Sequence, residues 1–260
     1  MLAAKNYALY YGHGRERELS QFDMAIVEPL GQTSVALKKI QEAGTLVLAY
    51  LSIMEIHSDS LDVDFLKEED LLAGPGGPLK NEQYGNWIVD LRSKRWNHML
   101  RQKVESLLCA GYDGIFLDTI ADVELVPVSP DCRTELIFAA AGFIADIKKE
   151  YCEHVIVQNN GVERLCLMTA KLIDGICWEN PPFDKTESAA WLKEVIRRLK
   201  RLHDEEKIAV FLLMQKENEA RNNNRNWRAR EVANQHGFLF YEAPRDYVAG
   251  VNTMSKIKSP

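Results

Sequence analysis

The sequence predicts a (β/α)8 barrel, on three observations. Eight short apolar segments alternate with segments of helical periodicity. The chain has 260 residues, a length that suits eight such units. No change in composition marks a linker, so residues 1–260 are expected to form a single domain. The structural alternative is a doubly wound open sheet. The first strand is not followed by a GxGxxG or GxxxxGKS/T motif, which disfavours a nucleotide-binding version of that alternative.

The expected strands are short apolar runs that end at polar residues or turn formers. In chain order they are residues 7–12, 24–27, 45–53, 114–118, 155–158, 175–178, 207–214 and 238–241. Helices are expected where apolar residues recur every three or four positions. In chain order they are 15–21 (a helical turn), 33–43, 96–110, 133–150, 163–170, 187–203 and 226–235.

A long insertion, residues 54–95, interrupts the alternation between the third and fourth strands. It contains the run Gly74-Pro75-Gly76-Gly77-Pro78, which is not expected to form regular structure. Residues 87–90 are expected to form a short extra strand. Long loops inside compact domains are usually functional or disordered, and the aromatic and acidic residues of this one favour order.

Composition argues against several classes of function. The net charge is −6, so nucleic acid is not an expected partner. The chain has no apolar run of 18 residues, so no membrane span is expected. No signal peptide is visible, which predicts a cytoplasmic protein as given, or a secreted or cell-envelope protein if a leader is missing.

The cysteines and histidines do not suggest a metal site. Five cysteines and six histidines are scattered, without CxxC, HxH or HExxH spacing. Reduced, mostly buried thiols are therefore expected, with no metal and no other cofactor.

Function in a (β/α)8 barrel is expected at the carboxyl ends of the strands. The polar residues at or just after these ends are Tyr11, Glu28, Tyr50, Ser52, Asp118, Asn159, Asn160, Glu179 and Tyr241. The insertion adds Glu55, Trp87 and Asp90 as candidate substrate contacts. Acids, amides and tyrosines on one rim suit a polyhydroxylated ligand. Core packing of the tyrosines and helix capping by the asparagines remain alternatives.

Asp118 and Glu179 are the candidate catalytic residues. Side chains alternate along a strand, so Gly114 shares a face with Asp118, and Gly175 with Glu179. If these faces point inward, both carboxylates reach the mouth of the barrel from strands four and six. Carboxylates about 5 Å apart characterise retaining glycosidases, although the sequence alone leaves the wider inverting spacing open.

The two acids need different environments to divide the chemistry between them. Trp178, Pro181 and Pro182 flank Glu179, and this apolar neighbourhood is expected to raise the pKa of Glu179. Glu179 is therefore assigned as acid/base, and Asp118 as nucleophile. The structural alternative is that either carboxylate is only a cap or an ion-pair partner.

Several stretches occur in the order seen in one known family. They are residues 22–29 (FDMAIVEP), 49–53 (AYLSI), Asn86-Trp87 with Asp90 and Trp96, 111–119 (GYDGIFLDT), 158–161 (QNNG) and 174–179 (DGICWE). On these residues the chain resembles glycoside hydrolase family 114, the spherulin-4-like, endo-α-1,4-polygalactosaminidase-like proteins. The resemblance implies a (β/α)8 barrel, a catalytic pair at Asp118 and Glu179, and retaining endo-hydrolysis of α-1,4-linked galactosamine polymers.

The chain departs from the family pattern near four strand ends. The departures are Glu28 in place of Asp, Met54-Glu55 in place of Gly-Glu, Ala121 followed by Asp122 in place of an Asp at 121, and Met214-Gln215 in place of Asp-Tyr. They leave the implied catalytic pair intact, with a polysaccharide or oligosaccharide as the expected partner. They also keep two alternatives open, a non-catalytic carbohydrate-binding barrel and a barrel enzyme that uses the same two acids with a divalent metal.

Overall fold

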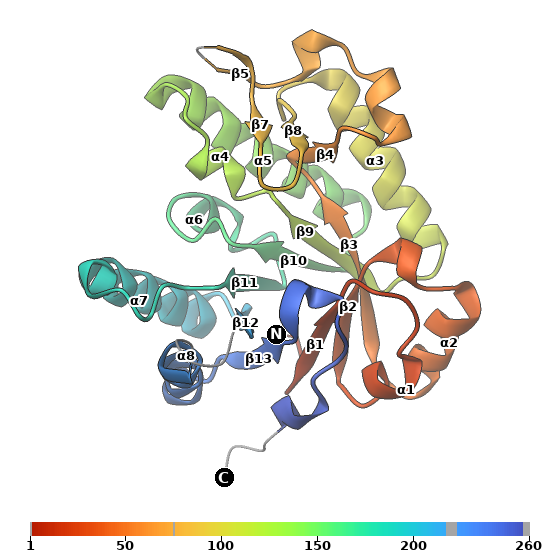
Figure 1. The fold of residues 1–260 in the computed structure, drawn as a ribbon, viewed down its shortest axis with the longest axis vertical. Helices are drawn as coiled ribbons and strands as arrows, with labels where there is room; N and C mark the ends of the chain where they lie inside the picture. The colour runs from red at the N-terminus through yellow and green to blue at the C-terminus, as the bar shows by residue number, and fades with distance from the viewer. Residues whose placement is uncertain (1, 75, 217–222, 257–260) are drawn as a thin grey trace.

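A computed structural model describes residues 2–74, 76–216 and 223–256. It confirms the predicted fold, with eight parallel strands in a nearly closed barrel flanked by helices (Figure 1). The barrel strands are β1 (Tyr7–Tyr10), β2 (Met24–Val27), β3 (Leu46–Ser52), β9 (Gly114–Asp118), β10 (Val155–Asn159), β11 (Gly175–Glu179), β12 (Ala209–Gln215) and β13 (Leu239–Ala243). Each is hydrogen-bonded to the next in this order.

The helices lie where the periodicity predicts them, with ends that differ by a few residues. They are α1 (Glu16–Leu19), α2 (Ser34–Glu42), α3 (Lys94–Cys109), α5 (Pro130–Glu150), α6 (Leu165–Thr169), α7 (Ala189–Glu205) and α8 (Asn223–His236). One short helix, α4 (Asp122–Leu125), was not predicted because four residues carry no periodic signal. Within the described ranges, no helix is long and apolar enough to cross a membrane.

The interior of the barrel is filled by large side chains that face small ones. The rings of Tyr7 and Phe211 pack edge to face at 4.9 Å, and Tyr241 lies 5.6 Å from Tyr7. A Cβ atom on Gly175 would lie 2.5 Å from the ring of Phe211, so this glycine faces the interior. Because side chains alternate along β11, Glu179 shares this inward face, as the sequence predicts.

The insertion between β3 and β9 is ordered by two small antiparallel sheets. The first joins β4 (Glu55–His57), β8 (Asn86–Ile88) and β7 (Lys80–Asn81), so the predicted extra strand is present. The second pairs β5 (Ala73–Gly74) with β6 (Gly77–Pro78). The prediction that this glycine- and proline-rich run lacks regular structure was therefore wrong. A tight reversal is possible because Gly77 adopts a φ of 114°.

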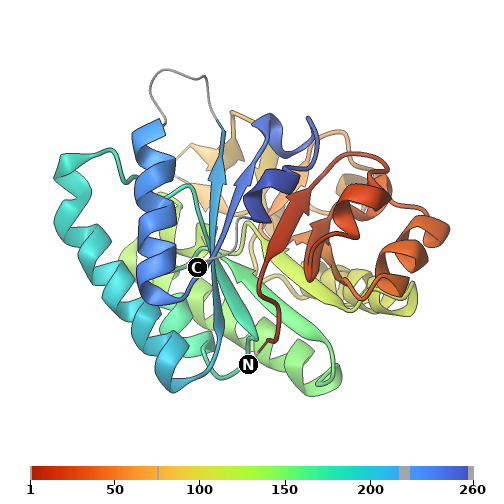
Figure 2. The same cartoon turned by 90° about the horizontal axis from the view of Figure 1, so that it is seen from below.

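The barrel has a seam between its first and last strands. β1 and β13 end the strand order, and the C-terminal segment lies beside this seam in both views (Figures 1 and 2). The segment includes a 3-10 turn, η5 (Arg245–Tyr247), that follows β13. The backbone N–H of Tyr11 donates to the carbonyl of Tyr247 at 2.9 Å, which fixes the segment to the end of β1.

Close strand packing at Gly114 gives a testable prediction for stability. A Cβ atom there would lie 2.1 Å from the carbonyl oxygen of Val155, a backbone atom that can move only if β9 and β10 separate. We expect Gly114→Ala to lower the free energy of unfolding by about 2 kcal/mol or more.

Gly142 of α5 provides the matched control, because no atom lies within 4 Å of its would-be Cβ. Gly142→Ala should stabilise the protein by up to about 1 kcal/mol through helix propensity. Urea unfolding followed by circular dichroism measures both effects. Equal stability of the two variants would contradict this packing.

Candidate active site

Three neighbouring strands end with the same backbone turn. β9, β10 and β11 end at Asp118, Asn159 and Glu179. The next residues, Thr119, Asn160 and Asn180, have φ values of 57°, 56° and 48°. A left-handed backbone costs a residue other than glycine about 1–2 kcal/mol. Asparagine adopts this conformation more readily than most residues, which suits two of the three positions.

Hydrogen bonds to the adjacent strand hold each of these turns. Thr119 Oγ1 accepts the N–H groups of residues 53 and 54 at 3.0 and 2.8 Å. Asn160 Oδ1 accepts the N–H of Glu179 at 2.9 Å, and Asn180 Oδ1 accepts the N–H of Gln215 at 2.8 Å. The turns therefore fix the backbone that carries the functional side chains. Asn160, predicted to bind substrate, uses its side-chain oxygen to position Glu179.

The side-chain amide of Asn159 joins the two predicted catalytic carboxylates. Its Nδ2 donates to Asp118 Oδ1 at 2.6 Å and to Glu179 Oε2 at 2.7 Å. Asn159 itself is buried, with 3% of its surface exposed. The two oxygens share one nitrogen, so they are no farther apart than the sum of these two distances. The structure thus brings the two acids together at the carboxyl ends of strands four and six.

Asp118 is surrounded by donors. Burial raises the pKa of Asp118, while hydrogen bonds from Asn159, the Thr119 backbone and Tyr50 oppose this rise. Donors of this kind stabilise the ionised carboxylate. Asp118 therefore has three donors available to stabilise a negative charge.

Glu179 has a different set of neighbours. Its Oε1 accepts the hydroxyl proton of Tyr247, and Asn180 Nδ2 donates to the same hydroxyl oxygen at 2.9 Å. Burial, followed by the charge of Asp118, raises the pKa of Glu179, while Tyr247 and Asn159 oppose the rise.

The raised pKa of Glu179 agrees with the expectation from the sequence, but Trp178, which was expected to contribute, faces away from the carboxylate. Trp178 precedes Glu179 but lies on the opposite face of β11. It packs edge to face against Phe183 and Trp191 at 5.7 and 6.0 Å. Trp178 therefore contributes to the helical layer outside the barrel, and alternation along the strand is the physical reason.

Three tyrosine rings surround the carboxylate pair. Tyr11, predicted from the end of the first strand, lies 4.7 Å from Tyr50 and 5.6 Å from Tyr247. Burial, then the charges of Asp118 and Glu179, raise the pKa of Tyr11. The sequence did not reveal Tyr247, because it lies beyond the last strand in a turn with a φ of 58°. The only available signal was an Asp-Tyr pair at residues 246–247.

A second pair of acids, Glu55 and Asp122, lies beside the first. Burial, followed by the charges of Glu55 and Asp118, raises the pKa of Asp122 to about 8. A side-chain hydrogen bond between Asp122 and Glu55 contributes to this rise. Asp122 lies one residue later than the family resemblance implies, yet it reaches the site.

Ser52 and Glu28, two further predicted residues, contact the protein backbone. Ser52 Oγ donates to the carbonyl of Glu55 at 2.8 Å and lies 3.1 Å from Thr119 Oγ1. Glu28 caps the short 3-10 turn η1 (Pro29–Gly31) by accepting the N–H of Leu30 at 3.3 Å. These two side chains therefore support turns close to the mouth of the barrel.

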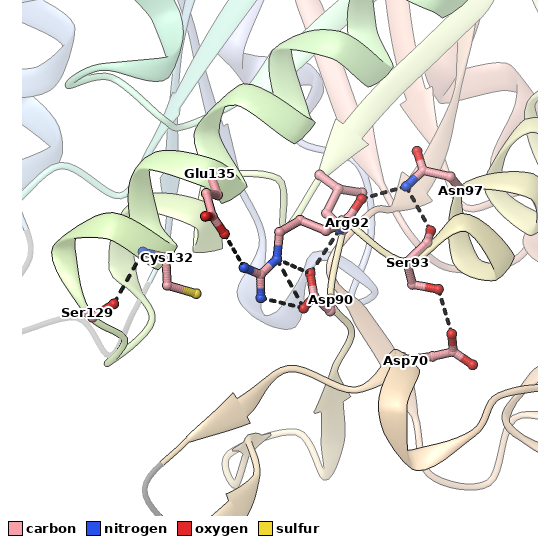
Figure 3. A network of polar contacts seen from close by, with 9 residues as sticks. Asp70, Asp90, Arg92, Ser93, Asn97, Ser129, Cys132 and Glu135 are labelled. Atoms are coloured by element: carbon pink, nitrogen blue, oxygen red, sulfur yellow. Dashed lines mark hydrogen bonds and ion pairs between the residues drawn. The ribbon is translucent and has the colours of Figure 1, made fainter.

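Asp90 and Trp87, which were predicted to line a subsite, both contact protein side chains. Asp90 makes two ion-pair contacts with Arg92, at 2.9 and 2.7 Å, and Arg92 also reaches Glu135 of α5 (Figure 3). This network anchors the insertion to the helical layer. The ring of Trp87 has Lys80 Nζ over its face, 3.8 Å from the ring centre.

Tyr241 belongs to the core of the barrel and not to its mouth. It has no exposed surface, and its hydroxyl accepts the N–H of Asn252 at 3.0 Å. The strand register aligns Glu179 with Leu213 and Leu213 with Tyr241. Barrel strands are staggered, so residues in register across several strands descend through the barrel. This stagger carries Tyr241 below the level of the acids.

Comparison with known proteins identifies the family. The model of glycoside hydrolase family GH114 matches residues 4–180. The match includes Asp118, Asn159 and Glu179, and it ends before β12, β13 and Tyr247. No curated protein matches the chain.

Solved structures share the fold at low sequence identity. The glycoside hydrolase domain of PelA from Pseudomonas aeruginosa aligns with a TM-score of 0.78 and 19% identity, covering 96% of this chain and 99% of that one. Aspergillus fumigatus Ega3, solved with galactosamine, aligns with a TM-score of 0.69 and 13% identity, covering 95% of this chain and 93% of that one. The α-galactosidase TtGalA from Thermus thermophilus, solved with stachyose, aligns with a TM-score of 0.63 and 16% identity, covering 95% of this chain and 63% of that one.

The family match spans more than half of the chain, across the strands that carry both acids. The barrel fold and the facing carboxylates agree with it. This protein belongs to glycoside hydrolase family GH114 and is a glycosidase.

Proposed function

We propose that this glycosidase cleaves α-1,4-linked galactosamine polymers at internal bonds, with retention of anomeric configuration. The observation that carries the proposal is the single amide of Asn159 hydrogen-bonded to both carboxylates. The family and the Ega3 structure with galactosamine support the choice of sugar. Acids at the mouth of the barrel suit a polymer whose free amino groups are cationic.

The spacing of the acids favours retention. Retaining glycosidases hold their carboxyl groups about 5–5.5 Å apart, and inverting enzymes about 6.5–9.5 Å, to leave room for a water molecule. Two oxygens bound to one nitrogen at 2.6 and 2.7 Å fit the shorter spacing. These two oxygens are therefore closer together than the carboxyl groups of inverting enzymes.

Retention proceeds through two displacements. Asp118 attacks the anomeric carbon while Glu179 gives its proton to the departing glycosidic oxygen, and a glycosyl ester with Asp118 forms. Glu179, now ionised, then takes a proton from water as the water oxygen attacks the same carbon. The ester bond breaks, Asp118 regains its negative charge, and Glu179 is protonated for the next cycle.

The division of roles follows from the hydrogen bonds. Asp118 accepts bonds from Asn159, Tyr50 and a backbone N–H, which stabilise its charged form. That charge disfavours ionisation of Glu179, so the shared proton resides on Glu179. Formation of the ester removes the charge of Asp118, which lowers the pKa of Glu179 when it must act as a base.

Replacement of either acid tests the assignment. Asp118→Asn and Glu179→Gln should each reduce the release of reducing ends from α-1,4-galactosaminan by at least about 10³-fold. Both variants should unfold at temperatures at least as high as the wild type, because burial already disfavours both charges. Asp131→Asn, an exposed change in α5, is the control. Near-normal activity of either catalytic variant would refute the proposal.

Removal of the Tyr247 hydroxyl tests its bond to Glu179. That bond opposes the rise in the pKa of Glu179, so Tyr247→Phe should raise this pKa further. The enzyme needs Glu179 protonated, so the alkaline limb of the kcat/KM profile should move to higher pH. We also expect kcat to fall about tenfold.

Tyr241→Phe is the matched control, since this buried hydroxyl contacts the Asn252 backbone and lies below the acids. It should leave the pH profile of kcat/KM in place. If the Tyr247→Phe profile coincides with that of Tyr241→Phe, Tyr247 does not tune Glu179.

The raised pKa of Asp122 predicts that the stability of the protein depends on pH. Its folded pKa, about 8, lies above the ordinary value of 3.8 for an aspartate, so between these pH values the folded protein binds more protons than the unfolded chain. This contribution to stability is full below pH 4 and is lost progressively up to about pH 8. In Asp122→Asn, the fall in melting temperature over this range should be smaller than in the wild type. If the melting temperatures of Asp122→Asn and the wild type fall in parallel over this pH range, the raised pKa of Asp122 is contradicted.

A further inference from the structure

One element at the mouth of the barrel has no assigned role. It is the 80–88 hairpin, which consists of β7, the turn 82–85 and β8. β8 pairs with β7 on one side and with β4 on the other, so the hairpin is part of the three-stranded sheet of the insertion. Figure 1 shows this sheet extending from the insertion toward the carboxyl ends of the barrel strands.

Glu55 holds the base of the turn. Its Oε1 accepts Asn81 Nδ2 at 2.7 Å, and its Oε2 accepts Asn86 Nδ2 at 2.6 Å. Asn81 and Asn86 are direct partners in the β7–β8 ladder and flank the turn. Both carboxylate oxygens of Glu55, which is 8% exposed, are therefore used to fix the hairpin. This explains a buried acid that the displacement chemistry does not need.

The hairpin is also attached to the end of β9 through β4. The N–H groups of residues 53 and 54, which lead into β4, donate to Thr119 Oγ1, and Thr119 follows Asp118. The hydrogen bond between Asp122 and Glu55 adds a second connection. The position of the hairpin relative to the nucleophile is therefore fixed by the scaffold.

The tip of the hairpin carries an exposed aromatic ring. Tyr84 is 61% exposed, and its backbone N–H donates to the Asn81 carbonyl at 3.2 Å. Gln83 Nε2 donates to the Tyr84 hydroxyl at 3.0 Å, and Gly85 adopts a φ of 70° that closes the turn. An exposed ring held on a short, clamped turn suggests a contact surface for a ligand.

The attachments of the hairpin place Tyr84 near the mouth of the barrel, among several acids. Burial, then the charges of Glu179, Glu55, Asp118 and Asp246, raise the pKa of Tyr84. These acids lie on β11, β4, β9 and the turn after β13, on different sides of the mouth. The phenol is therefore within electrostatic range of the catalytic pair.

We infer that the 80–88 hairpin is a fixed wall of the substrate groove and that Tyr84 is the platform of a sugar subsite next to the scissile bond. The ligand of this subsite is a hexosamine unit of the polymer, and the inference rests on the proposed function. The aromatic face packs against the C–H face of the sugar ring, and its negative quadrupole attracts a protonated amino group. Trp87 does not serve this purpose, because Lys80 covers its ring.

Binding and turnover test the subsite separately. The binding assay uses Glu179→Gln, which traps ligands without cleavage, with and without Tyr84→Ala. Binding is measured by calorimetry with α-1,4-galactosamine oligomers and with matched N-acetylgalactosamine and galactose oligomers. Tyr84→Ala should weaken the binding of the galactosamine oligomers about tenfold. Tyr84→Trp should restore the affinity. In the active enzyme, Tyr84→Ala should raise KM and leave kcat within about twofold.

Phe138→Ala is the matched control, because Phe138 is a similarly exposed aromatic residue on α5, 60% exposed. It should change neither affinity nor KM. Unchanged binding in Tyr84→Ala, with oligomers still bound by Glu179→Gln, would overturn the subsite alone. If Glu179→Gln binds none of the oligomers and the wild type cleaves no galactosaminan, the subsite and the proposed function both fail. An equal loss in Phe138→Ala would also overturn the subsite.

Discussion

Two partly buried acids that share one amide donor are the constraint on which the rest of this site depends. Like charges this close together repel, and burial makes each charge more costly. Asn159 stabilises both carboxylates with one nitrogen, at 2.6 and 2.7 Å. Tyr50 and Tyr247 then donate to one acid each, Asp118 and Glu179. Burial and the charge of Asp118 both raise the pKa of Glu179, which favours its role as proton donor in the proposed double displacement.

The backbone turns make this arrangement precise. Residues 119, 160 and 180 all adopt left-handed conformations directly after the strands that end in the functional side chains. Each accepts a backbone N–H from a neighbouring chain segment, which compensates for the cost of the turn. The same device repeated on three adjacent strands fixes the functional side chains relative to one another.

The sequence was sufficient for the barrel and for the central acids, because both depend on local patterns. Alternation along a strand placed Asp118 and Glu179 on the inward face without knowledge of their partners. The comparisons place both acids within the matched family region. Their exact roles stay a prediction until the variants are measured.

What the sequence could not supply depends on long-range geometry. Tyr241 appeared at a strand end, but the stagger of the barrel lowers it into the core. Tyr247 reaches Glu179 from a turn beyond the last strand, 68 residues away, with no periodic pattern to indicate it. Glu55 was recognised as an acid of the rim, yet only its two asparagine partners show that it fixes the 80–88 hairpin.

The stereochemistry of the first product tests the central claim most directly. Proton NMR of galactosaminan hydrolysis, recorded in the first minutes before mutarotation, distinguishes the anomers of the newly formed reducing end. Two displacements on Asp118 predict that the α-anomer appears first and the β-anomer follows by mutarotation. Initial release of the β-anomer would show a single displacement by water and would contradict the role of Asp118 as nucleophile.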